Sequence, residues 1–130
     1  MYYLRFAIAS IDGERLFDGH FGESDYYLIY DLNNERYEFI EQIKNLAKDF
    51  EEREHGDKRK AMKVSDLLSE CEALCGRAFG PNIKRIVKKF VPVVVRVEKV
   101  EEALRLLQES YESILKEYEK GEDRKHLVLK

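Results

Sequence analysis

Residues 73–95 read ALCGRAFGPNIKRIVKKFVPVVV, and this stretch decides the fold. The short apolar run Ala73–Cys75 ends at Gly76, as a buried strand does before a turn. The sequence GPN at 80–82 then marks the start of a helix, whose apolar side chains recur at helical spacing: Ile83, Ile86, Val87 and Phe90. A second apolar run, Pro92–Val97, follows. Strand, helix and strand in this order predict two parallel strands joined by a right-handed crossover.

The chain before this stretch predicts three more strands. Tyr2–Ser10 is apolar except for Arg5, which fits a strand buried on both faces. Tyr26–Leu32 and Arg36–Ile43 flank the turn Asn33-Asn34 and predict a hairpin. The second of these strands alternates aromatic with charged residues, as expected at the edge of a sheet.

Helical segments are expected on both sides of the deciding stretch. Residues 44–59 are highly charged and predict a mobile, partly helical connection, and apolar spacing predicts a helix from Lys60. Val100–Tyr118 keeps an apolar stripe that predicts one long helix, with Gly121 ending it. The tail at 122–130 leaves three alternatives open: a small strand, a contact with a partner, or a frayed end.

The element order predicts an α/β fold of three α/β/α layers around a mixed five-stranded sheet. A single domain is expected over residues 1–120, followed by a C-terminal tail at 121–130. Functional residues of such folds lie in loops at the carboxyl ends of the parallel strands. Three loops qualify, namely Asp12–Gly22, His55–Lys60 and Cys75–Asn82.

Composition limits the classes of partner. The 130 residues include 23 basic and 26 acidic side chains, a formal net charge of −3, so no global positive field attracts nucleic acid or anionic lipid. The apolar runs are too short to cross a bilayer, and the N-terminus does not resemble a secretory signal. We expect a cytoplasmic protein. A composition rich in Glu and Lys and free of Trp is typical of thermophiles.

Common catalytic signatures are absent from the sequence. It contains no GxGxxG, GK[ST], GxSxG or HExxH motif, which favours a protein that is not an enzyme. Cys71 and Cys75 are a weak zinc pair, because a structural zinc site takes four ligands. Of the two, Cys71 is expected in the core and Cys75 beside the loop after its strand. Asp12 and Asp31 near strand ends suggest a divalent-ion nuclease as a remote alternative.

Other side chains indicate binding chemistry. His20 is expected in a loop, where its imidazole is available as a neutral metal ligand, or else simply orders the loop. His55 and His126 lie in charged segments and are expected at the surface. A local basic patch is expected beside the Cys75 loop, formed by Arg77, Lys84, Arg85, Lys88 and Lys89.

Four segments together resemble a known family. They are FAIASIDG at 6–13, GHFGESDYYLIYDL at 19–32, LCGRAFGPNI at 74–83 and VPVVVRVEKVEEALRLL at 91–107. This pattern, from about Arg5 to Leu107, resembles the dinitrogenase iron-molybdenum cofactor biosynthesis accessory family of NifX-like and NafY-like domains. The resemblance implies a ribonuclease H-like fold and a protein that carries iron-molybdenum cofactor, an iron-sulfur cluster or a related precursor.

The resemblance also implies the binding residues. It matches His20 to the histidine of the family's HFG sequence and sets the loop after Cys75 opposite it. The expected cofactor-binding set is Asp12, His20, Phe21, Gly22, Cys75, Gly76 and Arg77, with His20 and Cys75 as metal ligands. Donor or acceptor proteins of the metal-sulfur cofactor are the implied partners of a monomer or homodimer. The alternative is a metal-free interaction or regulatory domain, with Tyr111 and Tyr118 forming a dimer face.

Overall fold

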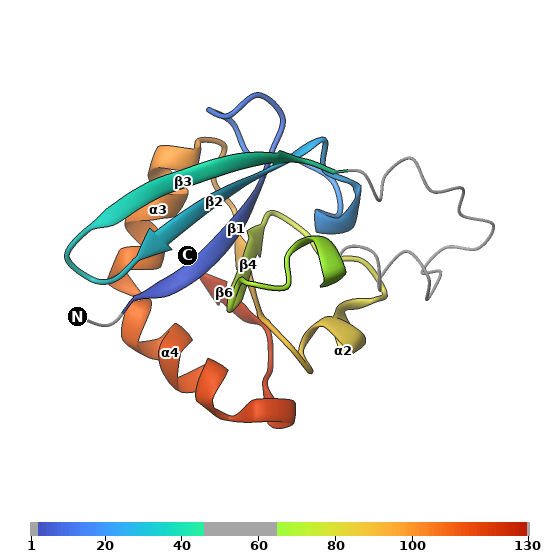
Figure 1. Ribbon diagram of the computed structural model, residues 1–130, viewed down its shortest axis with the longest axis vertical. Coiled ribbons are helices and arrows are strands. Elements are labelled where there is room, and N and C mark those ends of the chain that lie inside the picture. Colours follow the sequence, from blue (N-terminus) through green and yellow to red (C-terminus); the bar gives the residue numbers. More distant parts are fainter. Residues whose placement is uncertain (1–2, 46–64, 130) are drawn as a thin grey trace.

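A central strand, β1, organises the protein (Figure 1). The computed structural model describes residues 3–45 and 65–129. In chain order the strands are β1 Leu4–Ser10, β2 Tyr26–Leu32, β3 Tyr37–Lys44, β4 Ala73–Gly76, β5 Val91–Val95 and β6 Leu127–Leu129. The helices are α2 Ile83–Ile86, α3 Val100–Glu109 and α4 Tyr111–Glu119, with short 3-10 turns at Phe21–Glu23 and Gly121–Asp123.

The strands form one mixed sheet in the order β3-β2-β1-β4-β5-β6. β1 pairs antiparallel with β2 and parallel with β4, β2 pairs antiparallel with β3, and β4, β5 and β6 are mutually parallel. The hairpin and the parallel crossovers that the sequence predicted are therefore confirmed.

The sheet has six strands, so the expected number of five was wrong. The additional strand is β6 in the tail, where Leu127 pairs with Val93 and Leu129 with Val95. The chain turns toward it at Gly121, whose φ of 66° suits a residue without a Cβ. The carboxylate of Glu117 then accepts hydrogen bonds from the Lys125 N–H and the Lys120 ammonium. Three residues are too few to show a strand period, which is why the sequence left this segment open.

Both faces of the sheet are covered, which confirms the layered arrangement (Figure 1). Alternate side chains of β1 enter different cores, because successive side chains of a strand point to opposite faces. Leu4, Phe6 and Ile8 pack in the core beneath α3 and α4. Ala7 and Ala9 belong to the other core, with α2 and residues 65–71 on that side; it also contains Phe21, Tyr27, Leu68, Leu74 and Phe90.

The last long helix of the prediction is divided in two at Ser110. The φ and ψ angles of Ser110 are −103° and 9°, outside the helical region. The Ser110 N–H nevertheless donates a hydrogen bond to Leu106 O at 3.1 Å. The apolar spacing continues through the break, and Tyr111, four residues after the buried Leu107, lies in the core and is 3% exposed. The predicted dimer face through Tyr111 is therefore wrong. The predicted end of the α-helix near Gly121 is confirmed, because α4 ends at Glu119 and a 3-10 turn begins at Gly121.

Part of the predicted chain cannot be compared with the structure. The predicted connection at 46–59, the loop His55–Lys60 and most of the helix from Lys60 lie outside the described residues. Within residues 3–45 and 65–129, no helix combines the length and apolar character needed to cross a membrane.

Candidate functional site

Two loops that the family resemblance set opposite each other meet at the carboxyl ends of β1 and β4. The first contains His20 and the 3-10 turn at Phe21–Glu23, and residues 20–24 are called the His20 turn below. The second, residues 77–82, leads from β4 into α2. The Phe21 N–H donates to Ala78 O at 2.8 Å, and His20 forms a parallel bridge with Ala78. The backbone thus joins the two loops directly.

Phe21 anchors the His20 turn in the core. Its side chain is fully buried, with ring centroids 5.2 Å from Phe79, in a stacked arrangement, and 4.8 Å from Tyr27. Gly76 makes this packing possible, because a Cβ there would lie 3.2 Å from Phe21 Cδ2. The glycine at the end of β4 is therefore explained by the close approach of an aromatic ring.

His20 lies at the outer side of this anchor and is partly exposed. Its ring packs over the bare Cα of Gly80, since a Cβ on that glycine would lie 3.0 Å from His20 Nδ1. The backbone of His20 is extended, with φ −67° and ψ 138°, and the 3-10 turn begins at the next residue. An imidazole in this position combines access from solvent with a defined location, which suits a metal ligand.

A buried amide that sequence reasoning missed supports the turn from below. The Nδ2 atom of Asn45 donates hydrogen bonds to three oxygen atoms: Gly22 O at 3.0 Å, Ser24 O at 2.9 Å and Tyr27 Oη at 3.1 Å. The Tyr27 hydroxyl in turn donates to Phe21 O at 2.8 Å. A single Asn beyond an edge strand gives no pattern to recognise, and only its burial in the fold reveals these contacts.

The structure places Cys75 differently from the expectation. It lies within β4, paired with Ile8 and Val93, and is wholly buried in the core on the α3 and α4 side of the sheet. Phe21 belongs to the core on the opposite face. The thiol is therefore not in the loop, because alternation along the strand turns it away from the His20 turn and presents Gly76 to Phe21.

Burial also sets the chemistry of both thiols. It raises the pKa of Cys75 far above its ordinary value and raises the pKa of Cys71 to about 12. A neutral buried thiol is a poor nucleophile and a poor metal ligand. Cys71 is buried in the core, as predicted.

The two aspartates of the nuclease alternative lie far apart in the sheet. Asp31 pairs with Arg5 near the start of β1 and accepts its guanidinium at 2.8 and 3.0 Å. Asp12 follows the other end of β1 and accepts the N–H groups of Glu14 and Arg15. These hydrogen bonds, with the Arg15 side chain, lower the pKa of the Asp12 carboxyl. Arg5, the partner of Asp31, and Ser10, which precedes Asp12 at the end of β1, are roughly 17 Å apart at 3.3 Å per residue, so the two aspartates are not co-ligands.

No other metal cluster replaces that pair: among the described residues, no three His, Cys, Asp or Glu side chains gather closely enough to hold an ion. Asp12 instead caps the turn at 12–15, beside Gly13 with a φ of 90°. Its predicted contact with a cofactor stays a prediction.

The basic side chains lie beside the loop after β4, although the predicted helix is shorter than expected and α2 ends at Ile86. Arg77 follows Gly76 at the end of β4 and is partly buried. Four exposed residues belong to α2 and the turn after it: Lys84, Arg85, Lys88 and Lys89. The loop that contacts His20 therefore continues into a positively charged surface, although the whole chain is acidic.

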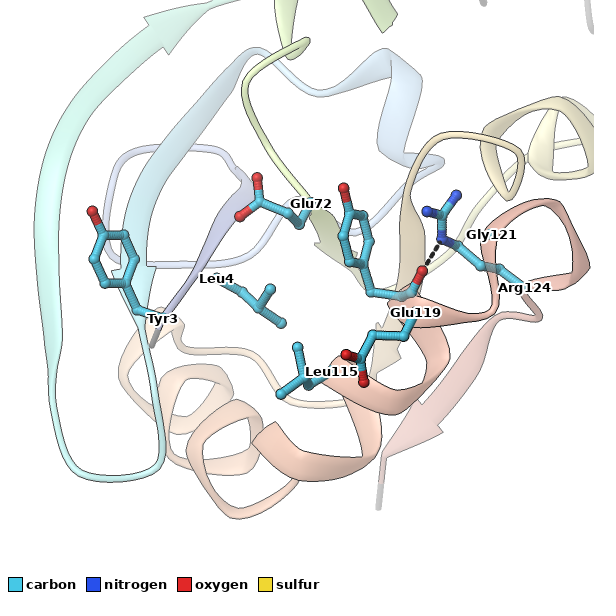
Figure 2. Close-up of a pocket in the computed structure, with 8 residues that line it drawn as sticks. Tyr3, Leu4, Glu72, Leu115, Glu119, Gly121 and Arg124 are labelled. Carbon is cyan, nitrogen blue, oxygen red and sulfur yellow. Dashed lines mark hydrogen bonds between the residues drawn. The ribbon is translucent and has the colours of Figure 1, made fainter. Parts of the chain in front are cut away.

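A cavity of about 640 Å³ lies at the opposite ends of β1 and β4 (Figure 2). In Figure 2, Leu4 and Leu115 lie between Tyr3 and Arg124. Arg124 stacks on the ring of Tyr118 at 4.5 Å and donates to the Tyr118 carbonyl at 2.8 Å. The lining contains none of the residues that the sequence predicted for cofactor or metal binding; it consists of Tyr3, Leu4, Glu72, Leu115, Tyr118, Glu119, Gly121 and Arg124.

A family model described as dinitrogenase iron-molybdenum cofactor matches residues 3–110, most of the chain. No curated protein sequence matches. The fold is similar to that of a protein from Methanocaldococcus jannaschii, described provisionally as a dinitrogenase, with a TM-score of 0.61. The two sequences are 18% identical, and the match covers 85% of this chain and 92% of the other, so this likeness shows the fold alone.

Proposed function

The chain belongs to the dinitrogenase iron-molybdenum cofactor family, and from that premise we propose that it is a small non-enzymatic carrier. Its cargo is the iron-molybdenum cofactor, an iron-sulfur cluster or a related metal-sulfide precursor. The protein receives this cargo from a donor protein and gives it to an acceptor. We also propose that the protein is cytoplasmic and has a ribonuclease H-like fold. The strand order, with helices on both faces of the sheet, supports this fold.

One observation carries the proposal: the imidazole of His20 is partly exposed yet held by the packing of the turn behind it. Imidazole nitrogen is a suitable ligand for iron, and a single protein ligand allows later release. The main-chain bond from Phe21 to Ala78 keeps this ligand in place without cargo. The site is therefore prepared to bind with little cost of ordering.

Charge complements the imidazole. Metal-sulfide clusters with molybdenum or iron are commonly anionic, and the loop after Gly76 continues into the basic residues Arg77, Lys84 and Arg85. The buried thiol of Cys75 has no part in this proposal, because its use as a ligand would require β4 to open. We propose that cargo contacts His20, Gly22 and Arg77 at the surface, while Phe21 and Gly76 support them from within.

A second function is favoured by one observation on the far edge of the sheet. Strand β3 exposes the aromatic side chains Tyr37 and Phe39, which are 46% and 51% accessible and make edge-on contacts with the ring of Tyr30. Exposed apolar residues on an edge strand are typical of surfaces that bind another protein. An interaction or regulatory domain without metal remains the alternative to the carrier.

The deciding experiment is anaerobic reconstitution with iron, sulfide and molybdate, followed by metal analysis and a visible spectrum. We expect a chromophore on the wild type and at least about a tenfold loss of occupancy in His20→Ala, as expected for removal of the ligand. Because the side chain is partly exposed, the free energy of unfolding should change by about 0.5 kcal/mol or less.

His126→Ala is the matched control, since His126 is an exposed histidine in the tail. It should bind cargo as the wild type does. Equal occupancy in His20→Ala and the wild type would contradict the site. A colourless, metal-free wild type under all conditions would favour the interaction domain.

A further inference from the structure

The side chain of Asn45 is the feature that carries an inference beyond the carrier function. It is 2% exposed and follows the end of β3, where its own N–H donates to Asp25 O at 3.0 Å. The main chain of this residue is thereby held by the hairpin of β2 and β3. Its carboxamide reaches across to the His20 turn, a separate part of the chain.

The amide nitrogen of this carboxamide lies among oxygen atoms. Three oxygen atoms, of Gly22, Ser24 and Tyr27, lie within 3.1 Å of Nδ2. An amide nitrogen has two hydrogens, so one hydrogen is shared between acceptors. The position needs a donor, and a side chain of the same shape that only accepts would face these oxygen atoms without a hydrogen.

Tyr27 extends the same network to the residue next to His20. Its hydroxyl accepts from Asn45 and donates to Phe21 O. The turn itself is closed by the Glu23 N–H to His20 O at 2.9 Å and the Ser24 N–H to Phe21 O at 3.2 Å. The buried amide therefore holds the carbonyl groups on the inner side of the turn, while His20 lies on its outer side.

We propose that Asn45 is a positioning residue for His20: its carboxamide, with the Tyr27 hydroxyl, fixes the turn so that the imidazole stays over Gly80 and is ready for cargo. This inference rests on the proposed function for its consequence in binding. Its structural part, the control of His20 by Asn45, is testable without cargo. A shift of the hairpin end would reach the His20 turn through this side chain.

The test is the isosteric substitution Asn45→Asp, compared with Asn33→Asp. Asn33 is also buried, but its Oδ1 accepts from the N–H groups of Glu35 and Arg36, at 2.8 and 3.0 Å. A carboxylate preserves those bonds at Asn33, whereas at Asn45 it places an acceptor against Gly22 O and Ser24 O. The same chemical change is thus expected to disturb the His20 turn at Asn45 and not at Asn33.

Tyr27→Phe is the second variant, and it stays informative where Asn45→Asp does not fold. It keeps the ring and removes only the hydroxyl that joins Asn45 to Phe21 O. The measurements are the imidazole NMR signal of His20, assigned with His20→Ala, the exchange rate of the Ser24 amide, and occupancy after reconstitution with iron and sulfide.

We expect Asn45→Asp to shift the His20 signal, to speed exchange of the Ser24 amide by about tenfold or more, and to lower occupancy by about tenfold. Tyr27→Phe should change all three in the same direction by less, and Asn33→Asp should match the wild type. Unchanged His20 signals and amide exchange in both Asn45→Asp and Tyr27→Phe would overturn the proposal. If these signals change but the wild type binds no cluster, positioning is supported and the carrier function fails.

Discussion

The His20 turn and strand β4 lie side by side, yet they give their predicted ligands opposite environments. His20 is partly exposed, while Cys75 is wholly buried and faces the other core. The contact between the two regions passes through Phe21 and Gly76 instead. The comparison shows that closeness to a strand end does not make a side chain available, because the alternation of the strand decides which face it enters.

Phe21→Ala should have the largest effect on the contact between the His20 turn and β4. The side chain is fully buried and packs on Phe79, Tyr27 and the bare face of Gly76. Its loss leaves a cavity between the two regions, and we expect a decrease of about 3–5 kcal/mol in the free energy of unfolding. Chemical denaturation measures this value. Phe39→Ala is the control, since Phe39 is half exposed on β3 and should cost much less.

A decrease below about 1 kcal/mol in Phe21→Ala would mean that the turn is not anchored in the core. The packing of His20 over Gly80 would then have no fixed support, and the difference between the two regions would lose its structural basis.

Cys75→Ser has the next largest expected effect and tests the other region. A hydroxyl in place of the buried thiol introduces a polar group in an apolar core, which should cost about 1–3 kcal/mol of stability. Cargo occupancy should not change. Cys75→Ala, which adds no polar group, serves as the control and should be less destabilising. Loss of cargo in both variants, at unchanged stability, would place the thiol among the ligands.

Much of the fold was predictable because apolar runs and turn residues such as Asn33-Asn34 and Gly80-Pro81 mark its elements. The hairpin, the crossover through Pro81 and the strand at Val91–Val95 follow from such patterns. The break at Ser110 was not predictable, since apolar spacing continues through it. β6 is too short to show a period, and its pairing depends on a turn that only the packed structure defines.

The site was predictable to a smaller extent. The meeting of the loops around His20 followed from the family resemblance, and the structure gives the reason in the bare faces of Gly76 and Gly80. The orientation of Cys75 required knowing which residue of β4 faces which core. Asn45 was missed because a lone polar residue shows its role only once its neighbours in space are known.

Gly80→Ala should have the smallest effect on stability and the sharpest effect on His20. Neither Gly80 nor Gly22 has a positive φ. Alanine at either position should therefore raise the free energy of unfolding by about 0.4–1 kcal/mol, because it lowers the conformational entropy of the unfolded chain. At Gly22 the new Cβ meets nothing within 4 Å, so that gain is kept. At Gly80 the new Cβ would lie 3.0 Å from His20 Nδ1, so the imidazole ring must move. The cost of this displacement offsets the gain in stability. We expect denaturation to show a more stable Gly22→Ala and an almost unchanged Gly80→Ala, while only Gly80→Ala displaces the NMR signal of the imidazole. Identical imidazole signals in both variants would show that His20 does not rest on Gly80, and the contrast between a supported ligand and a buried thiol would need another origin.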